Sequence, residues 1–104
     1  VLGHSKCGAL KGGLDSAQIE DLGMDNLNHL IGHFNPIINE IIEDGEERSS
    51  SNTDLLERLN HHNVKNAIDE IRKQSSTLRN LENEGKIKII GANYDVETGV
   101  VSWL

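Results

Sequence analysis

The segment Val1-Leu2-Gly3-His4-Ser5-Lys6-Cys7-Gly8-Ala9 is typical of a strand that passes directly into a helix. Val1 to His4 has the apolar character of the end of a buried strand. Ser5 is placed to cap a short helix that runs to Leu10, and Gly12-Gly13 would end that helix. We therefore expect the chain to open with a strand-to-helix junction, where glycines let the backbone pass close to the polar residues between them.

The next part of the chain has the spacing of two helices. Apolar residues recur at positions 27, 30, 31, 34, 37, 38, 41 and 42, which form one helical stripe. Pro36 lies inside the stripe and removes a backbone donor, so one continuous helix is not expected. Asn35 as cap and Pro36 at the first helical position predict that a second helix begins there. The polar residues 45–53 predict a surface loop, and residues 14–24 receive no assignment.

The C-terminal half predicts one long helical region followed by a hairpin. Helical spacing runs from Thr53 to Leu78, with a bend expected at residues 60–63. The β-branched segment 86–90 predicts a strand, and residues 100–103 predict a return strand after a turn at 95–99. The order of these elements predicts an α/β fold: a mostly parallel β-sheet flanked by helices, with an antiparallel C-terminal edge strand.

Length and charge limit the classes of protein to which the chain can belong. A chain of 104 residues supports one domain, and because it opens at Val1 we expect residues 1–104 to be a single partial domain, the C-terminal part of a larger fold. The net charge of −7 argues against a nucleic acid partner. No apolar run approaches the roughly 20 residues of a membrane span. We therefore expect no membrane partner. Cys7, the single cysteine, excludes an internal disulfide and favours a reducing compartment, so we expect a cytoplasmic protein.

His4 and Cys7 form a His-x-x-Cys pair at the predicted junction. Imidazole and thiolate are both zinc ligands, and a turn can point residues at this spacing toward one ion. Cys7 would lie in the first turn of the helix, where the helix dipole favours the thiolate. The same pattern is also typical of a buried free cysteine beside a hydrogen-bonded histidine. The spacing alone leaves both interpretations open.

Other polar clusters have a simpler interpretation than chemistry. His29 and His33 lie one helical turn apart and can clamp a metal. No third ligand of suitable spacing accompanies them, so a solvated helix face is favoured. His61-His62 is interpreted as a helix bend or a surface pair, and the acidic run at 43–47 as a solvated loop.

Residues 1–9 resemble the second zinc motif of the β-class carbonic anhydrases. The helix start at Asn63-Val64, the segment Gly-Lys-Ile-Lys-Ile-Ile-Gly-Ala at 85–92, and Tyr94-Asp95-Val96-Glu97-Thr98-Gly99-Val100 are similar to the closing section of that family. The resemblance spans nearly the whole chain and is loosest at residues 14–53. The chain thus resembles the C-terminal portion of a β-carbonic anhydrase, starting at the Gly-His-x-x-Cys-Gly motif.

The resemblance implies a zinc enzyme that interconverts carbon dioxide and bicarbonate. In that family two cysteines and one histidine hold the metal, with water or an aspartate in the fourth position. His4 and Cys7 match the histidine and the second cysteine of this set. Zinc acidifies its bound water, and the resulting hydroxide attacks carbon dioxide. The resemblance also implies a homodimer or a larger homo-oligomer. Because the core that these residues can form is small, we expect the stripe at 27–42 and the C-terminal hairpin to be covered by a missing part of the chain or by a partner.

The sequence departs from the family pattern in the other half of the metal site. The family's first cysteine ligand belongs to an earlier Cys-x-Asp-x-Arg segment, which also supplies an aspartate–arginine pair, and these 104 residues contain no such segment. We therefore expect the chain alone to be inactive. It is either the C-terminal part of a complete enzyme or a non-catalytic, carbonic-anhydrase-like interaction module. A thiol redox role for Cys7 is disfavoured because a resolving cysteine is missing.

The remaining candidates have weaker support. Ser5 would need a base to act as a nucleophile, and helix capping explains it better. Lys6 and Lys11 can attract bicarbonate, but exposed lysines need no such role. Tyr94 and Trp103 are expected to pack the hairpin against the core as residues of an edge strand.

Overall fold

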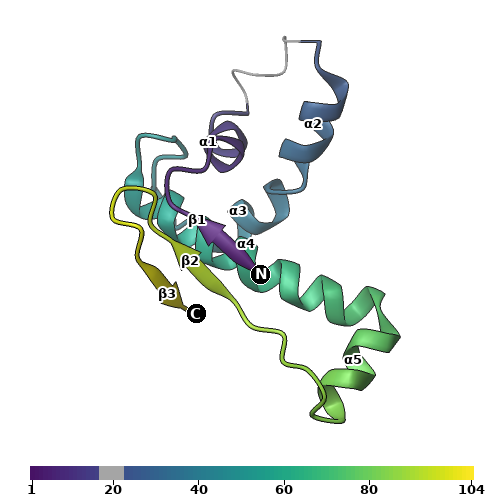
Figure 1. Cartoon of the computed structure of the whole chain (residues 1–104). Helices are drawn as coiled ribbons and strands as arrows, with labels where there is room; N and C mark the ends of the chain where they lie inside the picture. The colour runs from purple at the N-terminus through teal and green to yellow at the C-terminus, as the bar shows by residue number, and fades with distance from the viewer. Residues whose placement is uncertain (17–22) are drawn as a thin grey trace. The chain divides into compact units, whose positions relative to one another are not determined.

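The computed structural model describes residues 1–16 and 23–104, which divide into two compact units. The sheet unit contains Val1–Ser5 and His61–Leu104, and the helical unit contains Lys6–Asn60. The elements follow in the order β1 (Leu2–His4), α1 (Gly8–Leu14), α2 (Asp25–Gly32), α3 (Asn35–Ile41), α4 (Thr53–Gln74), α5 (Ser76–Asn83), β2 (Ala92–Tyr94) and β3 (Val101–Trp103) (Figure 1). Residues 17–22, part of the stretch without a predicted element, lie outside the described residues.

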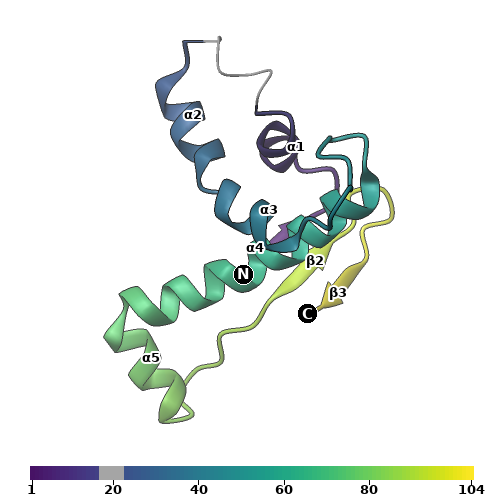
Figure 2. The same ribbon diagram turned by 180° about the vertical axis from the view of Figure 1, so that it is seen from behind.

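The sheet unit is built on a three-stranded sheet in the order β1-β2-β3. β1 pairs with β2 in parallel and β2 pairs with β3 antiparallel, so the strands lie side by side in both ribbon views (Figure 1 and Figure 2). The predicted α/β fold, with a parallel pair and an antiparallel C-terminal strand, is confirmed. The predicted turn is confirmed as well: the Gly99 N–H donates to the Asp95 carbonyl at 2.8 Å, and Gly99 has a φ of 74° that favours glycine.

Residues 86–90 do not form the predicted strand. The register places Leu2 opposite Ala92, so strand pairing begins beside Val1. The Val1 amino group donates to the Ile90 carbonyl at 2.7 Å, and the Ala92 N–H donates to the Val1 carbonyl at 3.0 Å. Among the described residues, no strand pairs with the segment before Ile90, and β-branched residues form a strand only beside a partner strand. The prediction was wrong because strand propensity does not supply that partner.

Helix α4 packs closely on one face of this sheet. Gly91, which precedes β2, faces the helix, and a Cβ atom built there would lie 2.8 Å from Val64 Cγ1 and 3.0 Å from Ile68 Cδ1. Only a residue without a side chain fits at this distance. The glycine therefore sets how near the strand comes to α4.

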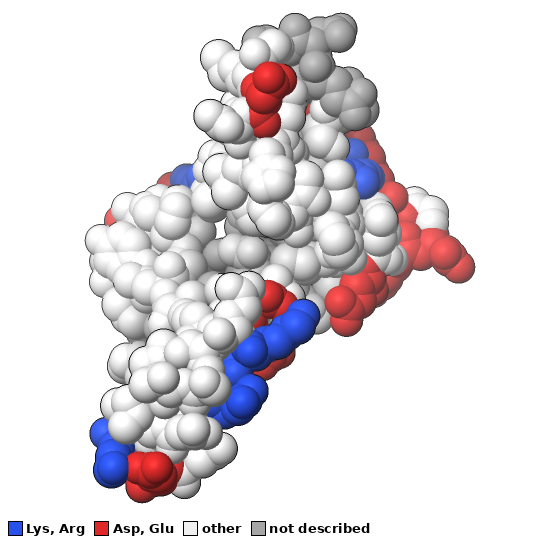
Figure 3. Space-filling view, turned by 90° about the vertical axis from the view of Figure 1, so that its right-hand side faces the viewer, with Lys and Arg blue, Asp and Glu red and all other residues white. Residues whose placement is uncertain are grey.

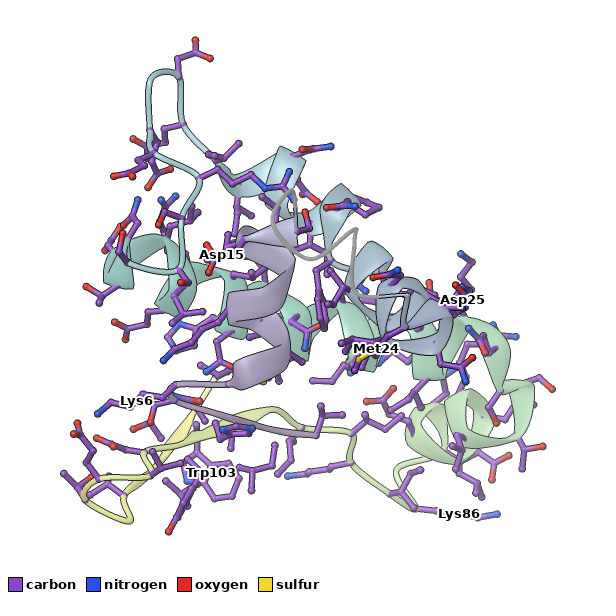
Figure 4. All side chains as sticks on the ribbon, turned by 90° about the horizontal axis from the view of Figure 1, so that it is seen from above. Lys6, Asp15, Met24, Asp25, Lys86 and Trp103 are labelled. Atoms are coloured by element: carbon purple, nitrogen blue, oxygen red, sulfur yellow. The ribbon has the colours of Figure 1, made fainter. Side chains whose placement is uncertain are left out.

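The opposite face of the sheet carries exposed apolar side chains at its two outer strands. Leu2, Ala92 and Trp103 lie in register on this face, because successive strand residues point to opposite sides. Ala92, on the central strand, is buried. Leu2 is 60% exposed and Trp103, labelled in Figure 4, is 73% exposed. The predicted burial of the strand Val1–His4 and the predicted packing of Trp103 are both wrong, since α4 packs on the other face. Tyr94 is also exposed, at 37%.

In the helical unit, two helices divide the apolar stripe at the predicted break. α2 ends at Gly32, and α3 begins at Asn35 with Pro36 in its first turn. The cap residue is Phe34 rather than Asn35. The stripe supplies much of the core of this unit, whose buried cluster consists of Leu10, Leu14, Phe34, Ile37, Ile38, Ile41, Leu55, Leu56 and Leu59.

Helix α1 differs from the prediction at both ends. It begins after Cys7, and no side chain caps it. Gly12-Gly13 lies inside the helix, which continues to Leu14. Phe34 explains the second glycine, because a Cβ atom at Gly13 would lie 3.0 Å from Phe34 Cδ2. The glycine at this position allows close packing and does not end the helix.

Helix α4 is the longest helix, with 22 residues from Thr53 to Gln74, and it runs without interruption through residues 60–63. The predicted helical region divides instead at Ser75, whose Oγ accepts a hydrogen bond from the Leu78 N–H at 3.2 Å and caps α5. In the parts of the chain that the structure describes, no helix has both the length and the apolar character needed to cross a membrane.

Candidate metal centre

The predicted metal motif begins at the end of β1. His4 is the last residue of this strand, and its side chain is exposed. Its Nδ1 lies 3.0 Å from the carbonyl oxygen of Ser5. Because a carbonyl oxygen can only accept, this hydrogen bond requires the ring proton on Nδ1 and leaves Nε2 of the neutral imidazole with an open lone pair. His4 can therefore offer Nε2 to a metal.

Ser5 is engaged by the neighbouring strand and turn. Its N–H donates to the Tyr94 carbonyl at 2.9 Å. Its Oγ accepts from the Val96 N–H at 3.0 Å and donates to Asp95 Oδ1 at 3.4 Å. The predicted cap on α1 is therefore wrong, because residues far along the chain hold this hydroxyl.

Lys6 and Cys7 carry the chain from the strand into α1, as predicted for the junction. Lys6, labelled in Figure 4, has a φ of 58°, a left-handed conformation that is uncommon for a residue with a side chain. Cys7 precedes the first residue of α1, and its carbonyl accepts from the Lys11 N–H at 3.1 Å. The Cys7 thiol is free and half-buried, and it packs against the core of the helical unit.

The chemistry of His4 and Cys7 fits zinc, but two ligands do not complete a site. Imidazole and thiolate are common zinc ligands, and catalytic zinc keeps three protein ligands. Across residues 1–16 and 23–104, no group of three or more His, Cys, Asp or Glu side chains can hold a metal. His4 belongs to the sheet unit and Cys7 to the helical unit, so their binding of one ion stays a prediction.

The other histidines do not form a metal site in the described part of the chain. The rings of His29 and His33 meet edge to face, with centroids 4.8 Å apart, and both side chains are exposed. The exposure of the two side chains agrees with the predicted solvated helix face. His61 and His62 are half-buried within α4 rather than at a break in it.

The acidic run at 43–47 contains a structural ion pair that the sequence does not indicate. Arg58 pairs with Glu46 and donates to the carbonyl of Ile41, the last residue of α3, at 2.8 Å. The Arg58 guanidinium lowers the pKa of Glu46, and Glu46 raises the pKa of Arg58. Glu46 is therefore an anchor of the loop and not a solvated side chain. The pair spans 12 positions, so no local pattern marks it.

A groove of about 320 Å³ lies on the sheet unit, and none of the motif residues 3–8 lines it. Its lining residues are Lys65, Ile68, Asp69, Arg72, Ile89, Ile90, Gly91 and Leu104. Arg72 is already bound by Glu82, with both carboxylate oxygens at 2.8 Å. Figure 3 shows basic and acidic side chains next to one another on the side of the molecule where α5 lies in Figure 1. The guanidinium of Arg72 is therefore not free to bind a ligand in the groove.

Comparisons with known proteins agree with the family resemblance of the sequence and with the fold. A family model described as carbonic anhydrase matches residues 1–101. A solved structure, "The structure of the beta-carbonic anhydrase CcaA", matches with a TM-score of 0.79 at 19% sequence identity. The match covers 100% of this chain and 48% of that chain, so the chain spans about half the length of that structure. The comparison with curated protein sequences found no match.

Proposed function

The chain belongs to the carbonic anhydrase family and has the fold of a β-carbonic anhydrase, and from this premise we propose that it serves the zinc-dependent, reversible hydration of carbon dioxide to bicarbonate. The observation that carries the proposal is the His4-x-x-Cys7 motif at the strand-to-helix junction, inside the matched residues 1–101. Carbon dioxide and bicarbonate are then the small-molecule partners of the site.

His4 and Cys7 are the residues that we propose as zinc ligands. The hydrogen bond from Nδ1 of His4 to the Ser5 carbonyl supports Nε2 as the donor atom. The Cys7 thiol is free, so no disulfide competes for its sulfur. Zinc, when bound, supplies Lewis acidity at the reacting centre. The part played by this chain is to present one nitrogen and one sulfur donor.

The remaining ligands must come from polypeptide outside these 104 residues. Cys7 is the single cysteine, and the sequence holds no Cys-x-Asp-x-Arg segment. We therefore propose that another segment or another chain supplies the second cysteine and the aspartate–arginine pair, and that the 104 residues alone are inactive. The proposal includes a homodimer or larger homo-oligomer. It also includes a cytoplasmic location, for which the single cysteine is the support.

A non-catalytic, carbonic-anhydrase-like interaction module is the second candidate. The missing half of the ligand set is the specific observation that favours it. The two candidates differ in one sequence feature: whether the parent reading frame contains a Cys-x-Asp-x-Arg segment upstream of Val1. Such a segment predicts an enzyme, and its absence predicts the module.

Zinc content and carbon dioxide hydration of the protein as encoded by that reading frame test the proposal. Elemental analysis measures the metal, and stopped-flow mixing with a pH indicator measures hydration. We expect His4→Ala and Cys7→Ser each to lose zinc and hydration together, while the control His29→Ala keeps both. Hydration that survives both ligand variants would overturn the proposed site. Zinc binding without hydration in the unsubstituted protein would favour the non-catalytic module.

A further inference from the structure

Ser5, the residue after His4, is hydrogen-bonded through its N–H, its hydroxyl and its carbonyl. The N–H donates to the Tyr94 carbonyl at 2.9 Å, and the Oγ accepts from the Val96 N–H at 3.0 Å. The carbonyl oxygen lies 3.0 Å from Nδ1 of His4. All these residues belong to the sheet unit. Ser5 thus connects the imidazole of His4 to β2 and to the turn that follows it.

Asp95 holds the hydroxyl of Ser5 from this turn. Its Oδ1 lies 3.4 Å from Ser5 Oγ and accepts from the Glu97 N–H at 2.8 Å, and its carbonyl accepts from the Gly99 N–H at 2.8 Å. The Glu97 N–H, with smaller contributions from Thr98 and Ser5, holds the pKa of Asp95 below its usual value. The carboxylate therefore stays charged, and available as an acceptor, at neutral pH.

We propose that Ser5 is a positioning residue for His4: the turn fixes the hydroxyl of Ser5, the carbonyl of Ser5 keeps the ring proton on Nδ1, and Nε2 is left to bind zinc. The inference rests on the proposed function for the identity of the metal. The position of the ring proton, by contrast, is a property of the chain without metal. Outer hydrogen bonds of this kind orient metal-binding histidines and fix their tautomer.

The backbone at Lys6 indicates why this junction must be held. The backbone φ of Lys6 is 58°, a left-handed conformation that is unfavourable for a residue with a Cβ atom. Strained residues of this kind persist only where the surrounding structure fixes them. The hydrogen bonds of Ser5 fix the N-terminal side of Lys6. Loss of the hydrogen bonds of the Ser5 hydroxyl therefore frees the backbone at Ser5 and Lys6, so that the Ser5 carbonyl no longer restrains the His4 ring.

Three variants test the inference. Ser5→Ala removes the hydroxyl, Ser5→Thr keeps it, and Ser102→Ala removes an exposed serine of the same sheet as the matched control. NMR of the His4 ring nitrogens in the metal-free chain measures which nitrogen carries the proton. Hydrogen exchange of the Val96 amide reports whether the bond to Ser5 is lost, and a titration with zinc measures affinity.

We expect Ser5→Ala to increase the share of the Nε2-protonated tautomer, to speed exchange at Val96, and to lower zinc affinity about 10–100-fold. Ser5→Thr and Ser102→Ala should match the unsubstituted chain in all three measurements. An unchanged tautomer in Ser5→Ala would overturn the inference, whether or not zinc binds. If Ser5→Ala fails to fold, the same measurements on Asp95→Asn decide, because an amide oxygen cannot replace the carboxylate as acceptor of the Ser5 proton at full strength. If His4→Ala binds zinc as well as the unsubstituted chain, the proposed function fails while the tautomer result still stands.

Discussion

Replacing Gly91 with alanine places a methyl group between the sheet and α4. The new Cβ would lie 2.8 Å from Val64 Cγ1 and 3.0 Å from Ile68 Cδ1, closer than side chains normally approach. The end of the Ile68 side chain can rotate away. Val64 cannot, because a β-branched residue in a helix has essentially one rotamer. The strand or the helix must therefore shift, and overpacking of this kind costs about 1–3 kcal/mol of unfolding free energy.

Denaturant unfolding followed by circular dichroism measures this loss. Gly32→Ala is the matched control, because nothing lies within 4 Å of the Cβ position at this exposed residue of α2. We expect the control to leave stability unchanged or to raise it by up to about 1 kcal/mol, since alanine favours helix over glycine. In thermal unfolding, each kcal/mol of unfolding free energy that is lost lowers the Tm of a chain of this size by roughly 4–8 °C. Equal unfolding midpoints for the two variants would refute the close packing of the strand on α4.

Three further perturbations test the packing, a cap and an ion pair. Leu59→Ala creates a cavity at a side chain that is 0% exposed and should lower the free energy of unfolding by about 2–5 kcal/mol. Leu78→Ala, at a side chain that is 39% exposed, should lower it by less. A larger loss for Leu78→Ala than for Leu59→Ala in chemical denaturation would contradict the core assignment. Ser75→Ala should cost about 0.5–2 kcal/mol and speed hydrogen exchange at the Leu78 amide, and unchanged exchange would contradict the cap. The pKa of Glu46 lies below its ordinary 4.5 in the folded chain, because Arg58 stabilises the charged form. The ion pair therefore stabilises the folded chain at pH values above 4.5, and this contribution is lost as the pH falls through the lowered pKa of Glu46. Glu46→Gln should flatten the acid dependence of the unfolding free energy, and an unaltered profile would argue against the pair.

Features that depend on residues close in sequence could be predicted. Pro36 divides the apolar stripe because proline removes a local backbone donor, and the break between α2 and α3 lies beside it. The turn at 95–99 closes through a bond from Gly99 to Asp95 that the local sequence favours. The junction between β1 and α1, around His4 and Cys7, could also be predicted from local sequence. The same short motif carries the resemblance to the family.

Features that depend on residues distant in sequence could not be predicted. Ser5 is a residue type that commonly caps a helix, but its hydroxyl is hydrogen-bonded instead to the Val96 N–H and to the Asp95 carboxylate. Gly13 is a residue type typical of a helix end, but its place inside α1 follows from Phe34, which packs so closely that a Cβ atom at Gly13 would lie 3.0 Å from Phe34 Cδ2.

Strand pairing and packing have the same dependence on distant partners. Residues 86–90 have strand propensity, but the register of β1 and β2 gives them no partner among the described residues. The same register turns Trp103 to the exposed face of the sheet. The position of the ring proton on His4 likewise depends on a hydrogen bond that the pattern does not contain.

The central claim, that His4 and Cys7 bind the same metal ion, is tested most directly by titrating the reduced chain with Co²⁺. Co²⁺ is a spectroscopic substitute for zinc, and a bound thiolate gives a sulfur-to-metal charge-transfer absorption that reports Cys7 even when the ligand set is incomplete. We predict that Cys7→Ser abolishes this absorption and that His4→Ala weakens Co²⁺ binding at least about tenfold, a loss of roughly 1.4 kcal/mol. The control His29→Ala should leave both unchanged. A charge-transfer band of equal strength and affinity in His4→Ala and the unsubstituted chain would contradict the claim.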